Sequence, residues 1–387
     1  LFLTNFNVIS NLFNLKLIYR YILQNFKINS KIIYLNFLLI LLLSHFKYGI
    51  VYLPSINGHF ELGVSLIDKK WSNLRNYYWS DSPLFNILQY FFKVNDFENY
   101  IILIYLLSLI FLFLISIKLS LLKEYSYLFV LGGWLVSVSW VFGLVDPVIV
   151  FCIISISINT IISRKFGWSE ILLLVFLVFN HFAIALFFSF VIFFFIDKKI
   201  IEKVIKLTAS YIVGFLINLM YKNIIGFNGE TRLHFLLRQE TIPELLHSFP
   251  QLLKYTIFSS FYGLIPILIY YLVFSKNKIN VKLILNLTIA LIGASLGTDF
   301  TRLFSYLIIP ALIYILNEVQ KSKINDINYY YFKKSLFIFS FLIILFFEEY
   351  WVIAPQHINH GSEYGGYSRI LWESIVGKLI SFKNLYF

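Results

Sequence analysis

The chain has few charged residues and a single cysteine. Only 13% of its 387 residues are charged, whereas a soluble domain has about 25%. One cysteine, Cys152, forms no intrachain disulfide and no cysteine-based metal site. The sequence also lacks phosphate-binding loops, nucleophile elbows, dinucleotide fingerprints and regular metal-ligand spacings. These absences exclude a soluble globular protein and the common cofactor-binding folds.

Apolar residues make up 59% of the chain. Apolar runs of about 18 residues recur from end to end, and each is long enough to cross a hydrocarbon core of ~30 Å. We therefore predict an all-α, polytopic transmembrane helix bundle of about 11 spans, with short interfacial helices in its outer loops. The predicted spans are 32–52, 100–117, 126–142, 147–163, 168–180, 182–196, 207–225, 255–274, 281–297, 301–317 and 335–353.

The region 168–196 is too long for one span and short for two. A polar pair, Asn180-His181, lies at its centre. We divide the region there into two short helices; a single long tilted helix is the alternative.

The charge distribution orients the predicted bundle. With a cytoplasmic N-terminus, 19 of the 32 basic residues and six of the 20 acidic residues fall inside. The inner face then carries +13 and the outer face −1, as the positive-inside rule expects. Topology thus accounts for the whole net charge of +12, and no nucleic-acid partner is needed to explain it.

This topology predicts three regions along the chain. Residues 1–31 form a basic amphipathic cytoplasmic leader that lies on the membrane, and residues 32–353 form the transmembrane domain. Two longer outer loops cover 53–99 and 226–254. Residues 354–387 form an amphipathic tail on the outer face. The expected location is the plasma (inner) membrane of a bacterial cell, with the C-terminus outside.

Ionisable residues at membrane depth are costly, and each is a candidate functional residue. Asp146 precedes Pro147 and is either a helix N-cap or a substrate-binding group. His181 is either a hydrogen-bonded core residue or a proton carrier that can also donate to a phosphate oxygen.

The segment Gly297-Thr298-Asp299-Phe300-Thr301-Arg302 is the strongest short signal. Asp299 and Arg302 are three residues apart at a predicted helix start and therefore share a face. One interpretation is a helix cap with a local ion pair. The other is that Arg302 binds a phosphate with its planar guanidinium while Asp299 orients it.

The outer loops supply further candidates. Glu61 and Asp68 lie in the first loop, where a carboxylate is either solvated or a general base. The second loop contributes Arg232. A pair of histidines, His357 and His360, lacks a third ligand and a helical frame, so we predict no protein-only metal site.

These features together resemble the GT-C superfamily of membrane glycosyltransferases, in particular those of bacterial cell-surface polysaccharide synthesis. The resemblance is carried by the first-loop carboxylates, the Gly143-Leu144-Val145-Asp146-Pro147 break, Asn180-His181 between short spans, and the late Asp299-x-x-Arg302. It extends as an architecture over residues 32–353. The adjacent acidic pair that the family usually has after the first span is missing.

The resemblance implies transfer of a sugar from a polyprenyl-phosphate-linked donor to a glycan, lipid or protein acceptor on the outer membrane face. It implies that a first-loop carboxylate is the catalytic base, which matches Glu61, with Asp68 as the rival. It implies that basic residues bind the lipid phosphate, and the matching positions are Arg302, His181 and Arg232.

Two other classes remain open at this point. A lipid-linked oligosaccharide polymerase or ligase would use the same lipid phosphate, and a transporter or flippase would show repeats and broken helices near the mid-membrane. The sequence fixes no cofactor, although carboxylates together with a substrate phosphate could hold a divalent cation. The expected partners are the lipid-linked donor, a glycan or lipid acceptor, and membrane lipids.

Overall fold

The computed structural model describes ten segments of the chain. They are residues 30–48, 55–68, 82–140, 144–224, 241–274, 280–297, 299–321, 326–346, 350–353 and 357–360. Nearly all of the predicted leader, most of the predicted tail, and Arg232 lie outside these residues.

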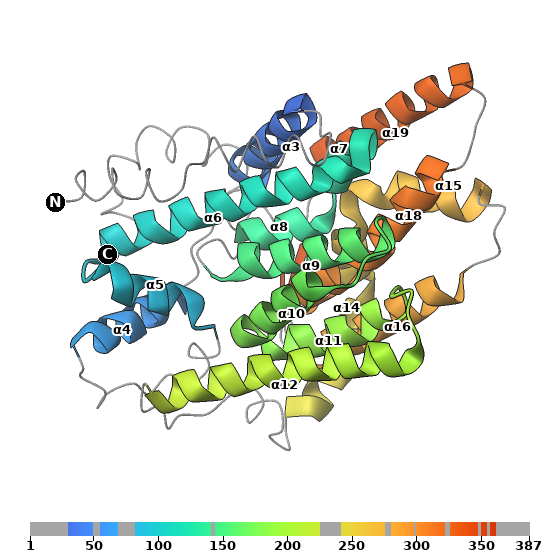
Figure 1. Cartoon of the computed structure of the whole chain (residues 1–387). Coiled ribbons are helices and arrows are strands. Elements are labelled where there is room, and N and C mark those ends of the chain that lie inside the picture. The colour runs from blue at the N-terminus through green and yellow to red at the C-terminus, as the bar shows by residue number, and fades with distance from the viewer. Residues whose placement is uncertain are drawn as a thin grey trace.

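The described residues are almost entirely helical, as the apolar composition predicts (Figure 1). The first half contains α3 (Ser30–Leu42), the π-helix η1 (Leu43–Tyr48), α4 (Ser55–Asp68), α5 (Leu84–Phe92), α6 (Phe97–Leu119), the 3-10 helix η3 (Ser120–Tyr125), α7 (Ser126–Val130), α8 (Gly133–Trp140), α9 (Asp146–Ile161), α10 (Trp168–Asn180) and α11 (Phe182–Phe193). The second half contains α12 (Ile200–Ile224), α14 (Thr241–Phe261), η4 (Tyr262–Leu264), α15 (Ile265–Phe274), α16 (Val281–Ser295), α17 (Phe300–Leu307), α18 (Ile309–Lys321), α19 (Asp326–Phe346), and the strands β1 (Tyr350–Ile353) and β2 (His357–His360).

Within the ten described segments, two helical stretches are long and apolar enough to cross a membrane, Phe97–Lys123 and Leu252–Leu272. A third candidate is the pair α17 and α18, which bends by 42° where the helices join. Shorter apolar helices of 10–17 residues account for much of the remaining bundle. The helical membrane character is thus indicated, and the count of about 11 spans remains a prediction.

Three predicted elements differ in the structure. The span over 301–317 is broken at Ile308, because Pro310 has no N–H to donate to the carbonyl of Tyr306 and so kinks the chain. Helix α14 begins at Thr241, in the part of the second outer loop where short interfacial helices are predicted, and continues through Pro250 into the predicted span without a break. The span over 335–353 is wrong for its last four residues, which form β1.

Strand β1 pairs with β2 in an antiparallel register, Tyr350 opposite His360 and Ile353 opposite His357. Aromatic and β-branched residues such as those of Tyr350–Ile353 favour strands over helices once a partner strand is present. Hydropathy alone cannot distinguish such a segment from the end of an apolar helix.

The predicted division at Asn180-His181 is confirmed. Helix α10 ends at Asn180 and α11 begins at Phe182. The Asn180 side chain accepts a hydrogen bond from the backbone N–H of Leu84, 3.3 Å away, and the Ser82 hydroxyl donates to the Asn180 carbonyl at 3.0 Å. These contacts join the break to the start of α5.

Helices α9 to α12 run up and down beside one another, which defines two ends of the bundle. The Asp146 end is where α9 begins and where α10 and α12 end. Asn218 of α12 donates to the carbonyl of Phe179 near the end of α10, at 2.8 Å. The Lys206 end is opposite, and there the Lys206 amine donates to the carbonyl of Phe166 at 3.4 Å. In Figure 1, α4 and α5 lie beside the start of α6 and the end of α12.

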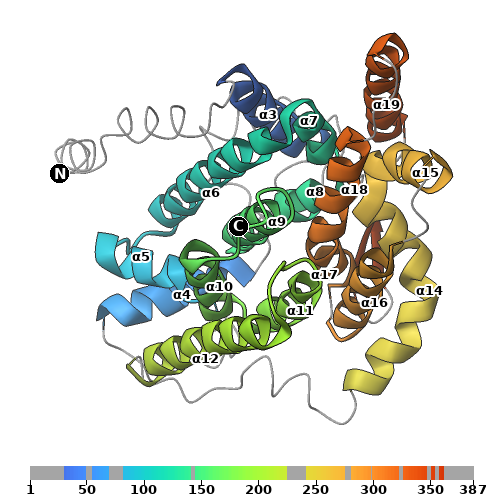
Figure 2. The ribbon, with the colours of Figure 1, turned by 45° about the vertical axis from the view of Figure 1, so that its right-hand side comes forward.

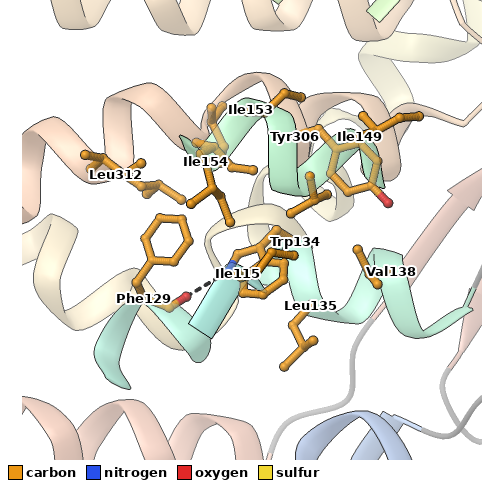
Figure 3. Packing of buried hydrophobic residues seen from close by; sticks show 14 of the residues in the cluster. Ile115, Phe129, Trp134, Leu135, Val138, Ile149, Ile153, Ile154, Tyr306 and Leu312 are labelled. Atoms are coloured by element: carbon orange, nitrogen blue, oxygen red, sulfur yellow. Dashed lines mark hydrogen bonds between the residues drawn. The ribbon is translucent and has the colours of Figure 1, made fainter. Parts of the chain in front are cut away.

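Buried apolar side chains from both halves of the chain form the core (Figure 3). Trp134 of α8 is fully buried, and its indole N–H donates to the carbonyl of Phe129 at 2.9 Å. The indole of Trp134 also stacks with the Phe129 ring. Ile149, Ile153 and Ile154 of α9 lie on one side of Trp134 in Figure 3. Nearly all residues of α9 are buried.

Helices α10 and α12 approach so closely that a side chain does not fit between them at Gly214. A Cβ atom there would lie 2.6 Å from the carbonyl oxygen of Val175. Because that atom belongs to the backbone, only glycine permits this spacing.

A buried carboxylate holds the Lys206 end together. Glu170 accepts hydrogen bonds from Asn159 at 2.7 Å, from Ser169 at 2.7 Å and from the Gly167 N–H at 2.6 Å. These bonds tie the start of α10 to the last turns of α9.

We predict that Glu170→Gln lowers the free energy of unfolding by about 1–3 kcal/mol, because the new amide would point an N–H at the N–H of Gly167. Thermal unfolding of the purified protein in detergent measures this change. The control is Glu202→Gln, which removes a partly exposed pair with Lys206 and should change stability by less than about 1 kcal/mol. Equal effects of the two variants would contradict the role of Glu170.

Candidate functional site

Two helix starts that are far apart in the sequence meet at the Asp146 end. Arg302, in the first turn of α17, lies 3.6 Å through its Nε from Oδ1 of Asp146, the first residue of α9. Its Nη1 lies 3.0 Å from Oδ2 of Asp299. The structure thus brings together three of the predicted site residues.

Tyr306 is a fourth member, which the sequence analysis missed. Its hydroxyl donates to Oδ1 of Asp146 at 2.9 Å. Tyr306 lies four residues after Arg302 and therefore on the same helix face. The four-residue spacing from Arg302 was the signal in the sequence. It does not distinguish Tyr306, because the chain contains 27 tyrosines. We call Asp146, Asp299, Arg302 and Tyr306 the ion cluster.

The local ion pair predicted between Asp299 and Arg302 is present, but the side-chain cap predicted with it is not formed. Val145, not Asp146, holds the N-cap position of α9. Asp299 is the N-cap residue of α17, but its side chain caps no backbone N–H. Each carboxylate instead faces the Arg302 guanidinium, because a buried cation offers a stronger interaction than a helix N–H.

The ion cluster is buried and carries a net charge of −1, since two carboxylates face one guanidinium. The side chain of Asp146 is 3% exposed, that of Arg302 12% and that of Asp299 19%. Asp299 is therefore the member that a substrate reaches most easily. The Nε of Arg302 is buried and faces Oδ1 of Asp146 at 3.6 Å, which is an ion-pair contact and too long for a hydrogen bond.

Hydroxyl groups line the neighbouring helices. Ser137 of α8 shares a hydrogen bond of 3.0 Å with Ser305 of α17. Ser260 of α14 donates to the carbonyl of Thr301 at 3.4 Å. These bonds fix α17 against α8 and α14, so the position of Arg302 is determined from several sides.

His181 has the contacts of a structural residue. It is buried, and its Nδ1 accepts the N–H of Ile184 at 3.3 Å, which caps α11. That hydrogen bond requires Nδ1 to be unprotonated, so the neutral ring carries its proton on Nε2. This contact ties His181 to its own helix.

The two candidate bases lie elsewhere. Glu61 and Asp68 are exposed residues of α4. In Figure 2, α4 and α17 lie apart, with α10 between them in that view. The structure does not place either carboxylate in the ion cluster. Arg232 lies outside the described residues.

Two buried lysines were also overlooked in the sequence. Lys47 in η1 is 8% exposed and Lys222 in α12 is 7% exposed. Both lie inside predicted apolar spans, and a lysine in such a run is itself a signal of function.

The described segments contain no group of three or more His, Cys, Asp or Glu side chains arranged to hold a metal ion. Asp146 and Asp299 are two carboxylates that face the same guanidinium. Comparison of the chain with protein-family models, with curated proteins and with solved structures found no match.

We predict that Arg302→Gln lowers the free energy of unfolding by about 3–5 kcal/mol, because it leaves two carboxylates buried without a cation. Adding Asp146→Asn to this variant should restore at least about 1 kcal/mol of the free energy of unfolding. The reason is that this substitution removes the charge of Asp146, which is buried more deeply than that of Asp299. Thermal unfolding measures both effects.

The control for this pair is Arg164→Gln, which changes an exposed arginine in the link between α9 and α10 and should shift stability by less than about 0.5 kcal/mol. Strictly additive effects of Arg302→Gln and Asp146→Asn would show that the two side chains are not coupled.

Proposed function

We propose that this protein is a polytopic membrane glycosyltransferase, with about 11 spans and a cytoplasmic N-terminus. In this proposal it moves a sugar from a polyprenyl-phosphate-linked donor to a glycan, lipid or protein acceptor on the outer face of the membrane. The observation that carries the proposal is the ion cluster, in which Arg302 is buried between Asp146 and Asp299.

A buried ion pair is a poor means of stabilising a helical bundle. Removing two charges from water costs several kcal/mol per ion, which is on the order of the attraction between the paired ions. Apolar side chains of similar volume often stabilise a protein more than a buried ion pair does. The ion cluster therefore supports a chemical role at the Asp146 end rather than a purely architectural one.

The opposite end supports the proposed orientation. Basic side chains gather there, including Lys198, Lys203 and Lys206 around the start of α12 and Arg164 and Lys165 in the link between α9 and α10. Under the positive-inside rule, the Lys206 end is then cytoplasmic and the Asp146 end is the outer one.

The chemistry needs a base and a group that stabilises the departing phosphate. In the proposed reaction a carboxylate of α4, Glu61 or its rival Asp68, removes the proton from an acceptor hydroxyl. The acceptor oxygen bonds to the anomeric carbon, and the bond between that carbon and the phosphate oxygen breaks. The electron pair leaves with the polyprenyl phosphate, whose negative charge needs nearby cations.

Arg302 alone does not supply the positive charge that the departing phosphate requires, because two aspartates already offset the charge of its guanidinium. In the proposal it orients Asp146 and Asp299.

One feature favours a second candidate, a transporter or flippase for the same lipid-linked sugars. The 42° bend between α17 and α18 makes a discontinuous helix, and such helices often form substrate sites in transporters. A transporter would move the lipid-linked sugar without cleaving it.

The test is a transfer assay of the purified protein with polyprenyl-phospho-sugars. We expect wild type to transfer sugar and Glu61→Gln to reduce the rate by about 100-fold or more, as loss of a general base does. The matched control is Glu98→Gln, an exposed carboxylate in the first turn of α6, which should keep full activity.

Several outcomes separate the assignments. Full activity of Glu61→Gln with loss in Asp68→Asn would transfer the role to Asp68. Movement of intact donor across vesicles without any cleavage would favour the transporter. No transfer from any such donor would refute the enzyme.

A further inference from the structure

Exposed basic side chains gather at the Lys206 end of the bundle, opposite the ion cluster. Arg164 and Lys165 precede α10, Lys199 precedes α12, and Lys282 lies in the first turn of α16. All four side chains are exposed, and none of them forms an ion pair or a side-chain hydrogen bond within the part of the chain that the structure describes. We call these four residues the basic rim.

The helix starts that carry the basic rim lie side by side. Lys206, in the second turn of α12, donates to the carbonyl of Phe166 in the link before α10. Lys203 of α12 donates to the carbonyl of Phe193 at the end of α11, 3.4 Å away, and α11 packs against α16. In Figure 1 the starts of α12 and α16 both lie on the right-hand side. The basic rim is therefore one charged region and not four scattered residues.

Two lysines of this region are close enough for their charges to repel. Burial lowers the pKa of the Lys203 amine, and the charge of Lys282 lowers it further, although Asp197 opposes the shift. Lys203 is held by the carbonyl and the ring of Phe193, whereas the side chain of Lys282 is exposed. A negative charge beside Lys282 would relieve this repulsion.

Large apolar side chains are exposed beside the basic rim. Trp168 in the first turn of α10 is 80% exposed, Ile201 in the first turn of α12 is 74% exposed, and Val281 at the start of α16 is 66% exposed. Basic residues next to an exposed tryptophan and exposed aliphatic residues are typical of a membrane interface. There the apolar groups reach the acyl chains while the cations stay among the head groups.

The apolar surface continues from the basic rim along α12. Ile201, Ile205, Ile212 and Leu216 are all exposed, and their spacings of four and seven residues place them on one helix face. From Ile201 to Ile212 the helix rises ~16 Å, which is about half of a hydrocarbon core of ~30 Å. An acyl chain can lie along this face while its head group remains at the basic rim. A soluble acidic protein would match the charges of the rim but not this apolar face.

We propose that the basic rim binds the head group of an anionic phospholipid, with the phosphate beside Lys199 and Lys282 and the acyl chains along the exposed face of α12. Arg164 and Lys165 attract further anionic head groups beside Trp168. The site lies at the opposite end of the bundle from the ion cluster, so it does not depend on sugar transfer.

The first measurement is the affinity of the purified protein for phosphatidylglycerol and for zwitterionic phosphatidylcholine, by native mass spectrometry in detergent. We expect wild type to bind phosphatidylglycerol more tightly. Lys199→Gln and Lys282→Gln should each weaken binding of phosphatidylglycerol by about fivefold, the effect of one lysine at an anionic surface. Both variants should leave phosphatidylcholine unchanged.

The matched control is Lys93→Gln, which changes an exposed lysine at the end of α5. The exposed carboxylates of Asp96 and Glu98 follow Lys93 closely in the sequence and offset its charge. This variant should bind both lipids like wild type.

The second measurement separates the acyl chains from the head group. Ile201→Ser and Ile205→Ser change exposed side chains, so the fold should be kept, and each should weaken binding of both lipids. Ile110→Ser, at an exposed position of α6, is the matched control and should bind like wild type. Glycerol phosphate, which has the head group but no acyl chains, should not bind measurably.

Three results would overturn the proposal. The first is equal affinity of wild type for phosphatidylglycerol and phosphatidylcholine, and the second is unchanged binding of phosphatidylglycerol in both lysine variants. The third is binding of a soluble anion in place of the lipid. Tight binding of glycerol phosphate would assign the basic rim to a free phosphate, and tight binding of polyglutamate that both lysine variants weaken would assign it to an acidic protein.

Discussion

The pairing of Arg302 with Asp146 and Asp299 is the constraint on which the Asp146 end of the bundle depends. A guanidinium cannot be buried without anions near it, so the start of α17 must lie against the start of α9. The bend before Pro310 separates α17, which packs against α14 and α16, from α18, which packs along α9. Tyr306 then reaches Asp146 from the same helix face.

Two polar regions share this end but differ in their chemistry. The ion cluster is largely paired within itself and carries a net negative charge. The second region contains Asn86 and Tyr221, which are buried and lack a partner at strict hydrogen-bond geometry, and the buried Lys222 follows Tyr221 in α12.

The fold was predictable where a local signal sufficed. Long apolar runs predicted helices, and the polar Asn180-His181 pair predicted the break between α10 and α11. The strand β1 was not predictable, because its residues continue an apolar run and become a strand only by pairing with β2. The continuity of α14 was not predictable either, because Pro250 favours a break between a short interfacial helix and the span, although the helix accommodates it.

The sequence by itself determined the helical, apolar character of the chain, the charge difference between its two ends, and the pairing of Asp299 with Arg302 three residues later. Each depends on composition or on neighbours within one helix turn. Only the tertiary structure decided that Asp146 joins Arg302, that His181 caps its own helix, and that Asn86 meets Tyr221. Two of these contacts join helices that are more than a hundred residues apart in the sequence, and the third selects one of several hydrogen-bond partners that His181 could have. Packing of the helices, not spacing along the chain, determines which side chains meet.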